Sequence, residues 1–237
     1  IRRIKGMGGI SESGDSIRIG ALTTVTEIRR DPLIAKAAPI LAEAAEHFAS
    51  DQIRNAASVG GNICNASPAG DMINPLLVLD AEIELARWEG GAVATRRVAM
   101  TDFFVAPRKT VKRDDELLTA VFFKRPAADF VGYFRKSGPR PALEISTVSV
   151  GIGGRLDKGV FRNVRVAMGS VAPTPLRARN VEAALEGKPL NADSIRAAVA
   201  ATDADAKPID DVRASAWYRD HLVKVFTEEV LNHVLGN

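Results

Sequence analysis

The spacing of apolar residues divides the first part of the chain into a strand and two helices. Apolar and polar residues alternate over 16–21, and Thr24 is followed three positions later by Glu27, which predicts a strand entering a capped helix. Apolar residues at helical spacing over 39–50 predict a second helix, which stops just before residue 58. The next stretch, SVGGNICNASPAGD at 58–71, is rich in glycine, proline, serine and asparagine.

The rest of the pattern predicts two α+β domains. An alternating strand is expected around Ile83 and Leu85 with a hairpin partner at 90–100, then a short helix, a charged loop and a strand that ends near Pro126. Beyond that point we expect two alternating strands joined by DKG at 157–159, and helices at roughly 178–186, 193–202 and 213–235. The predicted domains are residues 1–127 and 128–237.

Composition and charge exclude several classes of function. The net charge of +3 comes from 32 basic and 29 acidic residues that are well mixed along the chain, so we expect no nucleic-acid partner. No apolar run approaches the ~20 residues that span a bilayer. The single cysteine, Cys64, excludes an internal disulfide and cannot by itself hold an iron–sulfur cluster. This usage fits a reducing cytoplasm, and we expect a cytoplasmic protein.

The glycine-rich stretch has the composition of an anion-binding loop. Its adjacent glycines do not match G-x-G-x-x-G, and no lysine follows as in a P-loop. Gly60 and Gly61 nevertheless allow the main chain to approach a phosphate and to turn N–H groups toward it, while Ser58 and Asn62 can add donors. Asp71 would repel a phosphate, so a ribose hydroxyl is its better partner.

The same residues also have a purely structural interpretation. Glycines form turns, Ser67 precedes a proline, and Asp71 can cap the next helix. The three histidines, at positions 47, 221 and 233, are scattered on helical segments without a partnering acid or nucleophile. A self-sufficient oxidase with its own substrate pocket is therefore disfavoured.

A longer segment resembles a known family. The sequence QIRNAASVGGNICNASPAGDMINPLLVLDAEIEL, at 52–85, resembles the second flavin-binding segment of the FAD subunits of molybdenum hydroxylases. The family pattern is I-R-N-x-A-[ST]-[IV]-G-G-N, then A-S-P-x-x-D, then an apolar run and L-x-A. The likeness extends to IRIGALTTVTEI, DELLTAVFF, FRKSGPRPALEISTVSVG, VRVAMGSVAPTPLRARNVEAALEGKPL and RASAWYRDHLVKVF.

The resemblance implies positions for the cofactor FAD. The residues implied to line the FAD diphosphate are Ser58, Val59, Gly60, Gly61 and Asn62. The resemblance places Asp71 near the adenosine half of FAD. It also implies that Leu118 packs by the flavin end and that Lys136 lies near the isoalloxazine. A cation there would raise the flavin potential; the alternative for Lys136 is a solvated surface lysine. Cys64 matches no required family cysteine and is expected to be a small buried residue.

The resemblance also implies a fold, with one departure. It implies a FAD-binding domain of the PCMH/VAO-like type, followed by a C-terminal α+β domain with a short antiparallel sheet and helices. The family's earlier glycine-rich loop, of the form A-G-G-T in a small first subdomain, has no counterpart here, and KGMGGISESG is interpreted as a hairpin connector. We therefore expect only about half of the FAD cradle and weak FAD occupancy.

The implied function is electron transfer within a larger oxidoreductase. Such a chain carries FAD and passes electrons from the [2Fe–2S] clusters of a small partner subunit to an external acceptor, while a large molybdopterin subunit oxidises the substrate. The expected assembly is a dimer of heterotrimers. No extra [4Fe–4S] cluster is expected, because its cysteines are absent. The alternative is a structural or docking subunit without flavin. NAD, oxygen, a quinone or a redox protein all remain possible acceptors, and the substrate is open.

Overall fold

The computed structural model describes residues 1, 3–138, 140 and 144–236. The strands of the first half are β1 (Ile10–Ser13), β2 (Ser16–Gly20), β3 (Glu82–Glu89), β4 (Ala92–Ala99), β5 (Phe104–Ala106), β6 (Lys109–Thr110) and β7 (Leu117–Lys124). Its helices are α1 (Val25–Arg30), α2 (Pro32–Ala37), α3 (Pro39–Glu46), α4 (Asp51–Ala56), α5 (Val59–Cys64), α6 (Ile73–Val78) and α7 (Met100–Phe103). The second half contains β8 (Phe130–Ser137), β9 (Val148–Asp157), β10 (Val160–Gly169), β11 (Leu176–Arg177), β12 (Lys188–Pro189), α8 (Arg179–Leu185), α9 (Ala192–Asp205) and α10 (Ala216–Leu235).

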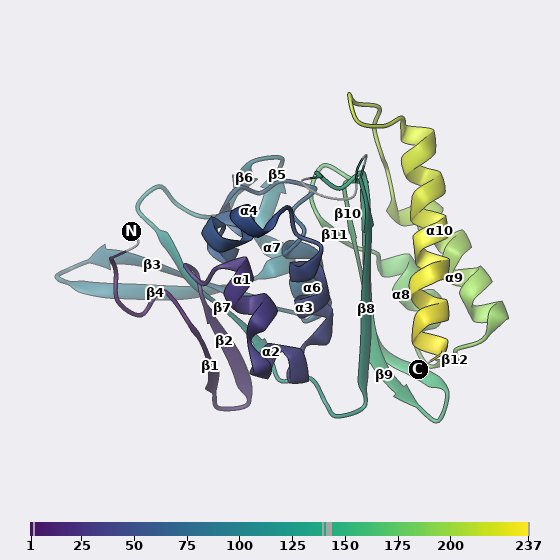
Figure 1. The fold of residues 1–237 in the computed structure, drawn as a ribbon, viewed down its shortest axis with the longest axis horizontal. Coiled ribbons are helices and arrows are strands. Elements are labelled where there is room, and N and C mark those ends of the chain that lie inside the picture. The colour runs from purple at the N-terminus through teal and green to yellow at the C-terminus, as the bar shows by residue number, and fades with distance from the viewer. Residues whose placement is uncertain (2, 139, 141–143, 237) are drawn as a thin grey trace.

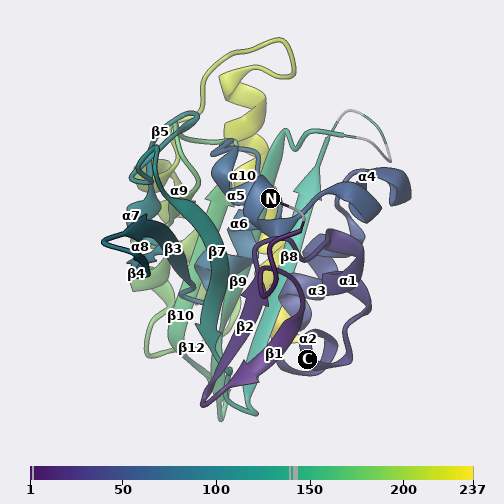
Figure 2. The same cartoon turned by 90° about the vertical axis from the view of Figure 1, so that its left-hand side faces the viewer.

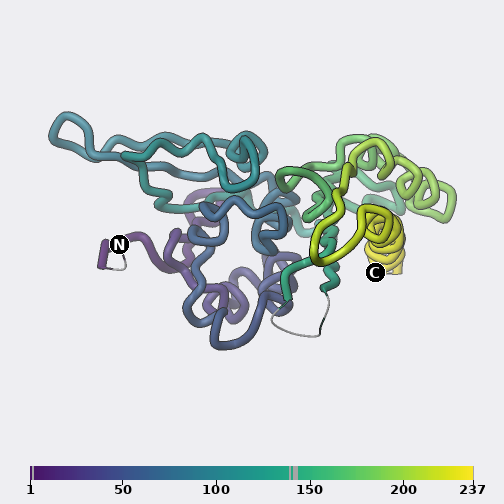
Figure 3. Tube along the Cα trace, turned by 90° about the horizontal axis from the view of Figure 1, so that it is seen from above, coloured from purple at the N-terminus to yellow at the C-terminus, as the bar shows by residue number. Residues whose placement is uncertain are grey.

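These elements form four layers (Figure 1). An antiparallel sheet of order β1-β2-β7-β3-β4 lies on one side, and helices α1–α6 lie between it and a second sheet of order β11-β10-β9-β8. Helices α8–α10 cover the outer face of the second sheet. Figure 2 looks onto the first sheet, and Figure 3 shows the β3–β4 hairpin projecting at the end of the molecule away from α10. The mixed helix and sheet architecture expected from the sequence is confirmed.

Local patterns place many of these elements as predicted. Ile17 and Ile19 are fully buried on one face of β2, and Thr24 with Glu27 forms a complete capping box at the start of α1. The β3–β4 hairpin and the β9–β10 hairpin are confirmed. At the tip of the latter, Lys158 (φ 49°) and Gly159 (φ 79°) both have the left-handed conformation that a tight hairpin turn requires.

Two expectations about the first half need correction. The helix over 39–50 does not lead directly into the glycine-rich stretch, because α4 lies between them. The glycine pair is not in a loop: it forms the first turn of α5, with Ser58 as N-cap. Glycine has a low helix propensity, which hides so short a helix from sequence analysis.

The two halves of the chain share a core. Phe134 and Ala167, from the second half, belong to the hydrophobic cluster that α1–α6 form with the first sheet. Helix α6 packs on β9 and β10, and a Cβ added at Gly153 would lie 2.7 Å from Val78 Cγ1. The second core fills the space between the outer face of β8–β10 and α8–α10. The predicted boundary near residue 127 falls in the connection between β7 and β8; it stays a prediction.

Candidate functional site

The first turn of α5 is fixed against the segment that follows β2. The Val59 N–H donates to Thr23 O at 3.0 Å, and the Gly60 N–H donates to Ala21 O at 2.9 Å. A Cβ at Gly60 would lie 2.7 Å from the Ala21 Cβ and 2.8 Å from the Ala21 oxygen, so only glycine fits this approach.

Within the turn, the remaining amides are also paired. Ser58 Oγ accepts from the Gly61 N–H at 3.2 Å, and the Asn62 N–H donates to Ser58 O at 3.0 Å. The sequence predicted that the Gly60 and Gly61 amides turn toward an anion. The structure instead gives both amides partners within the chain, so close packing is what requires glycine at position 60.

An apolar cavity opens beside this turn. It has a volume of about 160 Å³, and its lining includes Leu22, Ser58, Gly61, Cys64 and Leu118. We call it the α5 cavity. It brings together Ser58, Gly60, Gly61 and Leu118, four of the predicted site residues, although Leu118 lies on β7, far from the others in sequence. Cys64 is exposed, which corrects the expectation of a buried cysteine.

Asn62 carries a buried polar atom without a partner. Its Oδ1 is shielded from solvent and accepts no hydrogen bond from the described part of the chain. A buried acceptor that lacks a donor costs about 1–3 kcal/mol, so such a group is typical of a site that a ligand completes. Asn62 lies one turn into α5 and directly follows Gly61, which lines the α5 cavity, although Asn62 itself is not part of that lining.

Asp71 and Lys136 form a buried ion pair. Lys136 Nζ donates to Asp71 Oδ2 at 2.7 Å, and Ser146 Oγ donates to Asp71 Oδ1 at 2.5 Å. The side chains of Lys136 and Asp71 are only 3% and 7% exposed. Burial raises the pKa of Asp71 and outweighs Lys136 and Ser146, which lower it.

These contacts correct the structural interpretations of both residues. Lys136 is not a solvated surface lysine. Asp71 caps no helix, because α6 begins at Ile73 with Met72 as N-cap and has no side-chain cap. The two residues are 65 positions apart, and no local pattern links them.

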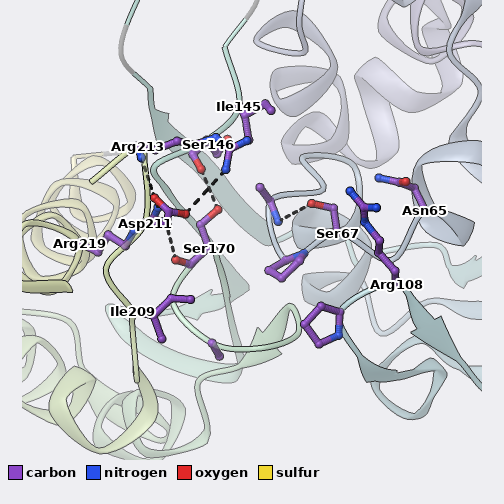
Figure 4. Close-up of a pocket in the computed structure, with 14 residues that line it drawn as sticks. Asn65, Ser67, Arg108, Ile145, Ser146, Ser170, Ile209, Asp211, Arg213 and Arg219 are labelled. Carbon is purple, nitrogen blue, oxygen red and sulfur yellow. Dashed lines mark hydrogen bonds and ion pairs between the residues drawn. The ribbon is translucent and has the colours of Figure 1, made fainter. Parts of the chain in front are cut away.

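A second, more polar cavity lies beyond the other end of α5 (Figure 4). It has a volume of about 360 Å³. Three arginines define it, Arg108, Arg213 and Arg219, and we call it the arginine cavity. Asn65 and Ser67, which follow α5, lie on the same side as Arg108, while Ser146 and Ser170 lie across from them. Since Ser146 also binds Asp71, this cavity reaches the buried ion pair.

The chain matches two family descriptions. Residues 1–126 match "FAD binding domain in molybdopterin dehydrogenase", and residues 133–234 match "CO dehydrogenase flavoprotein C-terminal domain". The chain is 34% identical to the xanthine dehydrogenase FAD-binding subunit of Escherichia coli O157:H7 over 238 aligned residues. The alignment covers all of this chain and 80% of that subunit. The chain belongs to the FAD-binding subunits of molybdenum hydroxylases. It is thus a subunit type found in oxidoreductases.

Further similarities support this membership. The glyceraldehyde dehydrogenase medium chain of Sulfolobus acidocaldarius is 31% identical over 234 residues, which cover 99% of this chain and 81% of that one. The solved structure of carbon monoxide dehydrogenase from Hydrogenophaga pseudoflava superposes with a TM-score of 0.94 at 29% identity, covering all of this chain and 80% of the other. The resemblance seen in the sequence is confirmed.

One conspicuous ion pair, between Glu116 and Arg96, has no signal in the sequence. Glu116 accepts from Arg96 Nε at 2.6 Å and Nη2 at 2.8 Å, and from the Arg113 N–H at 2.8 Å. The hydrogen bonds from Arg96 hold the pKa of Glu116 at about 2, against an ordinary 4.5. Glu116 also lines the α5 cavity. Its charge stands in a run of charged residues, where nothing in the sequence sets it apart.

Other functional classes find no support in the described residues. None of their histidine, cysteine, aspartate and glutamate side chains form a group that could hold a metal ion. His47, His221 and His233 are exposed, and His47 Nε2 lies 2.9 Å from Glu43 Oε1 on the same helix. No helix in the described ranges is long and apolar enough to cross a membrane.

Proposed function

We propose that this chain is the FAD-carrying subunit of a molybdenum hydroxylase, which takes electrons from the [2Fe–2S] clusters of a small partner subunit and passes them through FAD to an external acceptor. Family membership supports the class, and the orphaned Oδ1 of Asn62 on α5 supports a bound ligand at this helix. FAD supplies the redox chemistry when it is bound. This chain's residues bind and orient it.

The contact between Asp71 and Lys136 sets the direction in which we expect FAD to lie. The resemblance implied opposite ends of the cofactor for these residues, yet they are bonded at 2.7 Å. An extended dinucleotide cannot have its two ends at one ion pair. We therefore assign both residues to the isoalloxazine end.

The adenosine end then falls in the α5 cavity. Leu118 lines this cavity beside Ser58 and Gly61, so we place Leu118 at the adenosine end, not at the flavin end that the resemblance implied. The diphosphate lies between, along Ser58–Asn62. With the glycine amides already paired, the Ser58 hydroxyl and the Asn62 Nδ2 amide are the donors proposed to bind the diphosphate, while the Asn62 Oδ1, an acceptor, is proposed to take a hydrogen bond from a hydroxyl of the same cofactor.

Asn62 offers the sharpest test. In the FAD-loaded subunit, Asn62→Ala should weaken FAD retention about tenfold, because one buried hydrogen-bonding side chain is lost. Flavin released on desalting measures the effect. Asn232→Ala, at an exposed position on α10, is the matched control. Retention equal to that of the control would overturn the assignment.

A second candidate is a docking subunit without flavin. The pairing of the Gly60 and Gly61 amides within the chain favours it, because those donors are not free for a phosphate. Under this alternative, the full-length subunit would show no flavin absorbance even after incubation with excess FAD. Bound flavin would exclude it.

The remaining assignments are proposals on family grounds. We propose partnership with a small [2Fe–2S] subunit and a large molybdopterin subunit, as a dimer of heterotrimers in the cytoplasm. The PCMH/VAO-like domain type belongs with these proposals. Sedimentation of the co-expressed subunits tests the assembly.

A further inference from the structure

Lys136 is held between acidic groups and is not a free cation. Its Nζ donates to Asp71 Oδ2 at 2.7 Å, and Glu144 Oε1 lies 4.0 Å from the same Nζ. The Glu144 side chain is 11% exposed, and a Cβ added at Gly138 would overlap its carboxylate, so Glu144 packs closely beside the end of β8. Among the described residues here, one ammonium thus faces two carboxylates. This differs from the uncompensated cation that the sequence suggested beside the flavin.

Asp71 accepts hydrogen bonds at both of its carboxylate oxygens. Lys136 supplies the donor at Oδ2, and Ser146 Oγ donates to Oδ1 at 2.5 Å. This is the pattern of an ionised carboxylate, which only accepts. Burial raises the pKa of Asp71, whereas Lys136, Ser146 and the charge of His47 lower it. The ionised state of Asp71 therefore depends on these few neighbours.

The charged groups around this pair come from three elements. Lys136 belongs to β8, and Glu144 belongs to the connection between β8 and β9. His47 is exposed at the end of α3, where it pairs with Glu43 at 2.9 Å. Helix α6, which follows Asp71, carries no charged side chain. Ser146 is thus an uncharged donor that acts on Asp71 among charged neighbours.

Ser146 is fixed in position by the fold. It is 1% exposed and lies two residues before β9. Its carbonyl oxygen accepts from Ser170 Oγ at 2.8 Å (Figure 4), and the N–H of the next residue, Thr147, donates to Ser137 O at 2.7 Å. These bonds place the Ser146 hydroxyl at Asp71, beside the strand that carries Lys136. A hydroxyl has one hydrogen to donate, and Ser146 uses it on Asp71.

We propose that Ser146 is a positioning residue of the redox site: its hydroxyl keeps Asp71 paired with Lys136, so that the isoalloxazine faces a neutral ion pair and not a free ammonium. This inference rests on the proposed function, which places the pair at the isoalloxazine end. A free ammonium beside the ring would stabilise the reduced cofactor and raise its potential. Pairing with Asp71 cancels that effect. The lower potential makes reduced FAD a stronger donor to the external acceptor.

The test measures the reduction potential of the FAD-loaded subunit by spectroelectrochemistry at acid, neutral and alkaline pH. In Ser146→Ala, Asp71 loses a donor and takes up a proton at a higher pH, which leaves Lys136 opposed by Glu144 alone. Near neutral pH, the variant should have about tenfold more reduced over oxidised flavin at the same applied potential, or ~30 mV for a two-electron couple. The two potentials should converge at acid pH, where Asp71 is protonated in both proteins.

Three further variants separate the hydrogen bond from packing. Asp71→Asn removes the negative charge permanently, so its potential should exceed that of the parent also at alkaline pH, where Ser146→Ala matches the parent. Ser146→Thr keeps the hydroxyl and should restore the parent's pH profile. Ser11→Ala, an exposed serine on β1, is the matched control and should have the potential of the parent.

A second measurement needs no cofactor. Carbon-13 NMR of labelled aspartate side chains in the FAD-free subunit follows the Asp71 carboxyl directly, and Ser146→Ala should move its titration to higher pH. An Asp71 titration identical in parent and variant, or equal flavin potentials at every pH, would overturn the inference and leave the proposed function standing. A parent subunit that retains no FAD would refute the proposed function and, with it, the redox role of Ser146.

Discussion

The buried ion pair between Asp71 and Lys136 allows a quantitative test that needs no cofactor. Both side chains are almost fully buried, at 7% and 3% exposure. Removing one partner of such a pair costs about 3–5 kcal/mol; Glu144 Oε1 lies 4.0 Å from Lys136 Nζ and offsets part of the remaining charge, which places Asp71→Ala toward the lower end of that range. Asp71→Ala should therefore lower the free energy of unfolding by about this amount, which corresponds to roughly 6–20 °C in a chain of this size.

The double variant separates pairing from packing. The cost of burying Asp71 outweighs its attraction to Lys136, so the pair as a whole adds little to the free energy of unfolding. The double variant Asp71→Ala with Lys136→Met should therefore be more stable than Asp71→Ala alone. The expected coupling energy is about 2–3 kcal/mol. Urea unfolding of the parent, the two single variants and the double variant at pH 7 measures this coupling energy. If the losses in free energy of unfolding of the two single variants simply add up in the double variant, the buried pair is refuted. A loss below about 1 kcal/mol for Asp71→Ala would also refute it.

Two further predictions concern the α5 cavity. Glu116 has a lowered pKa, so its contribution to stability is present above 4.5 and is lost as the pH falls toward about 2. Because solvent around Arg96 weakens the ion pair, Glu116→Gln should lower the free energy of unfolding by about 1–2 kcal/mol at pH 7. Thermal unfolding at several pH values measures this difference. A difference that stays constant down to pH 3 would contradict the prediction. Gly60→Ala places a Cβ 2.8 Å from the Ala21 oxygen, so overpacking of about 1–3 kcal/mol should exceed the gain in helix propensity. A melting temperature equal to that of the parent would show that the segment at Ala21 moves away from the added methyl group without a measurable cost.

The sequence was sufficient where structure depends on local pattern. Alternation identified β2, and the spacing of Thr24 and Glu27 identified the capping box of α1. The apolar positions of α10 also gave its extent closely. Such elements bury one face against a core, and that face is visible as a period in the sequence.

The site was harder to predict because it depends on contacts between distant residues. The glycine pair suggested free amides, whereas the segment at Ala21 accepts one of them. One available signal was missed: Lys136 follows Phe134 by two residues in β8, and alternate residues of a strand share a face. A lysine that shares a face with an apolar residue such as Phe134 is expected to need a buried partner. Its partner, Asp71, could not be identified without the fold.

The most direct test of the account is a structure of the FAD-loaded subunit. We expect the diphosphate beside Ser58 and Asn62, the adenosine against Leu118, and the isoalloxazine next to the Asp71–Lys136 pair. A nucleotide bound away from α5, or one bound with its adenosine at Lys136, would contradict the account.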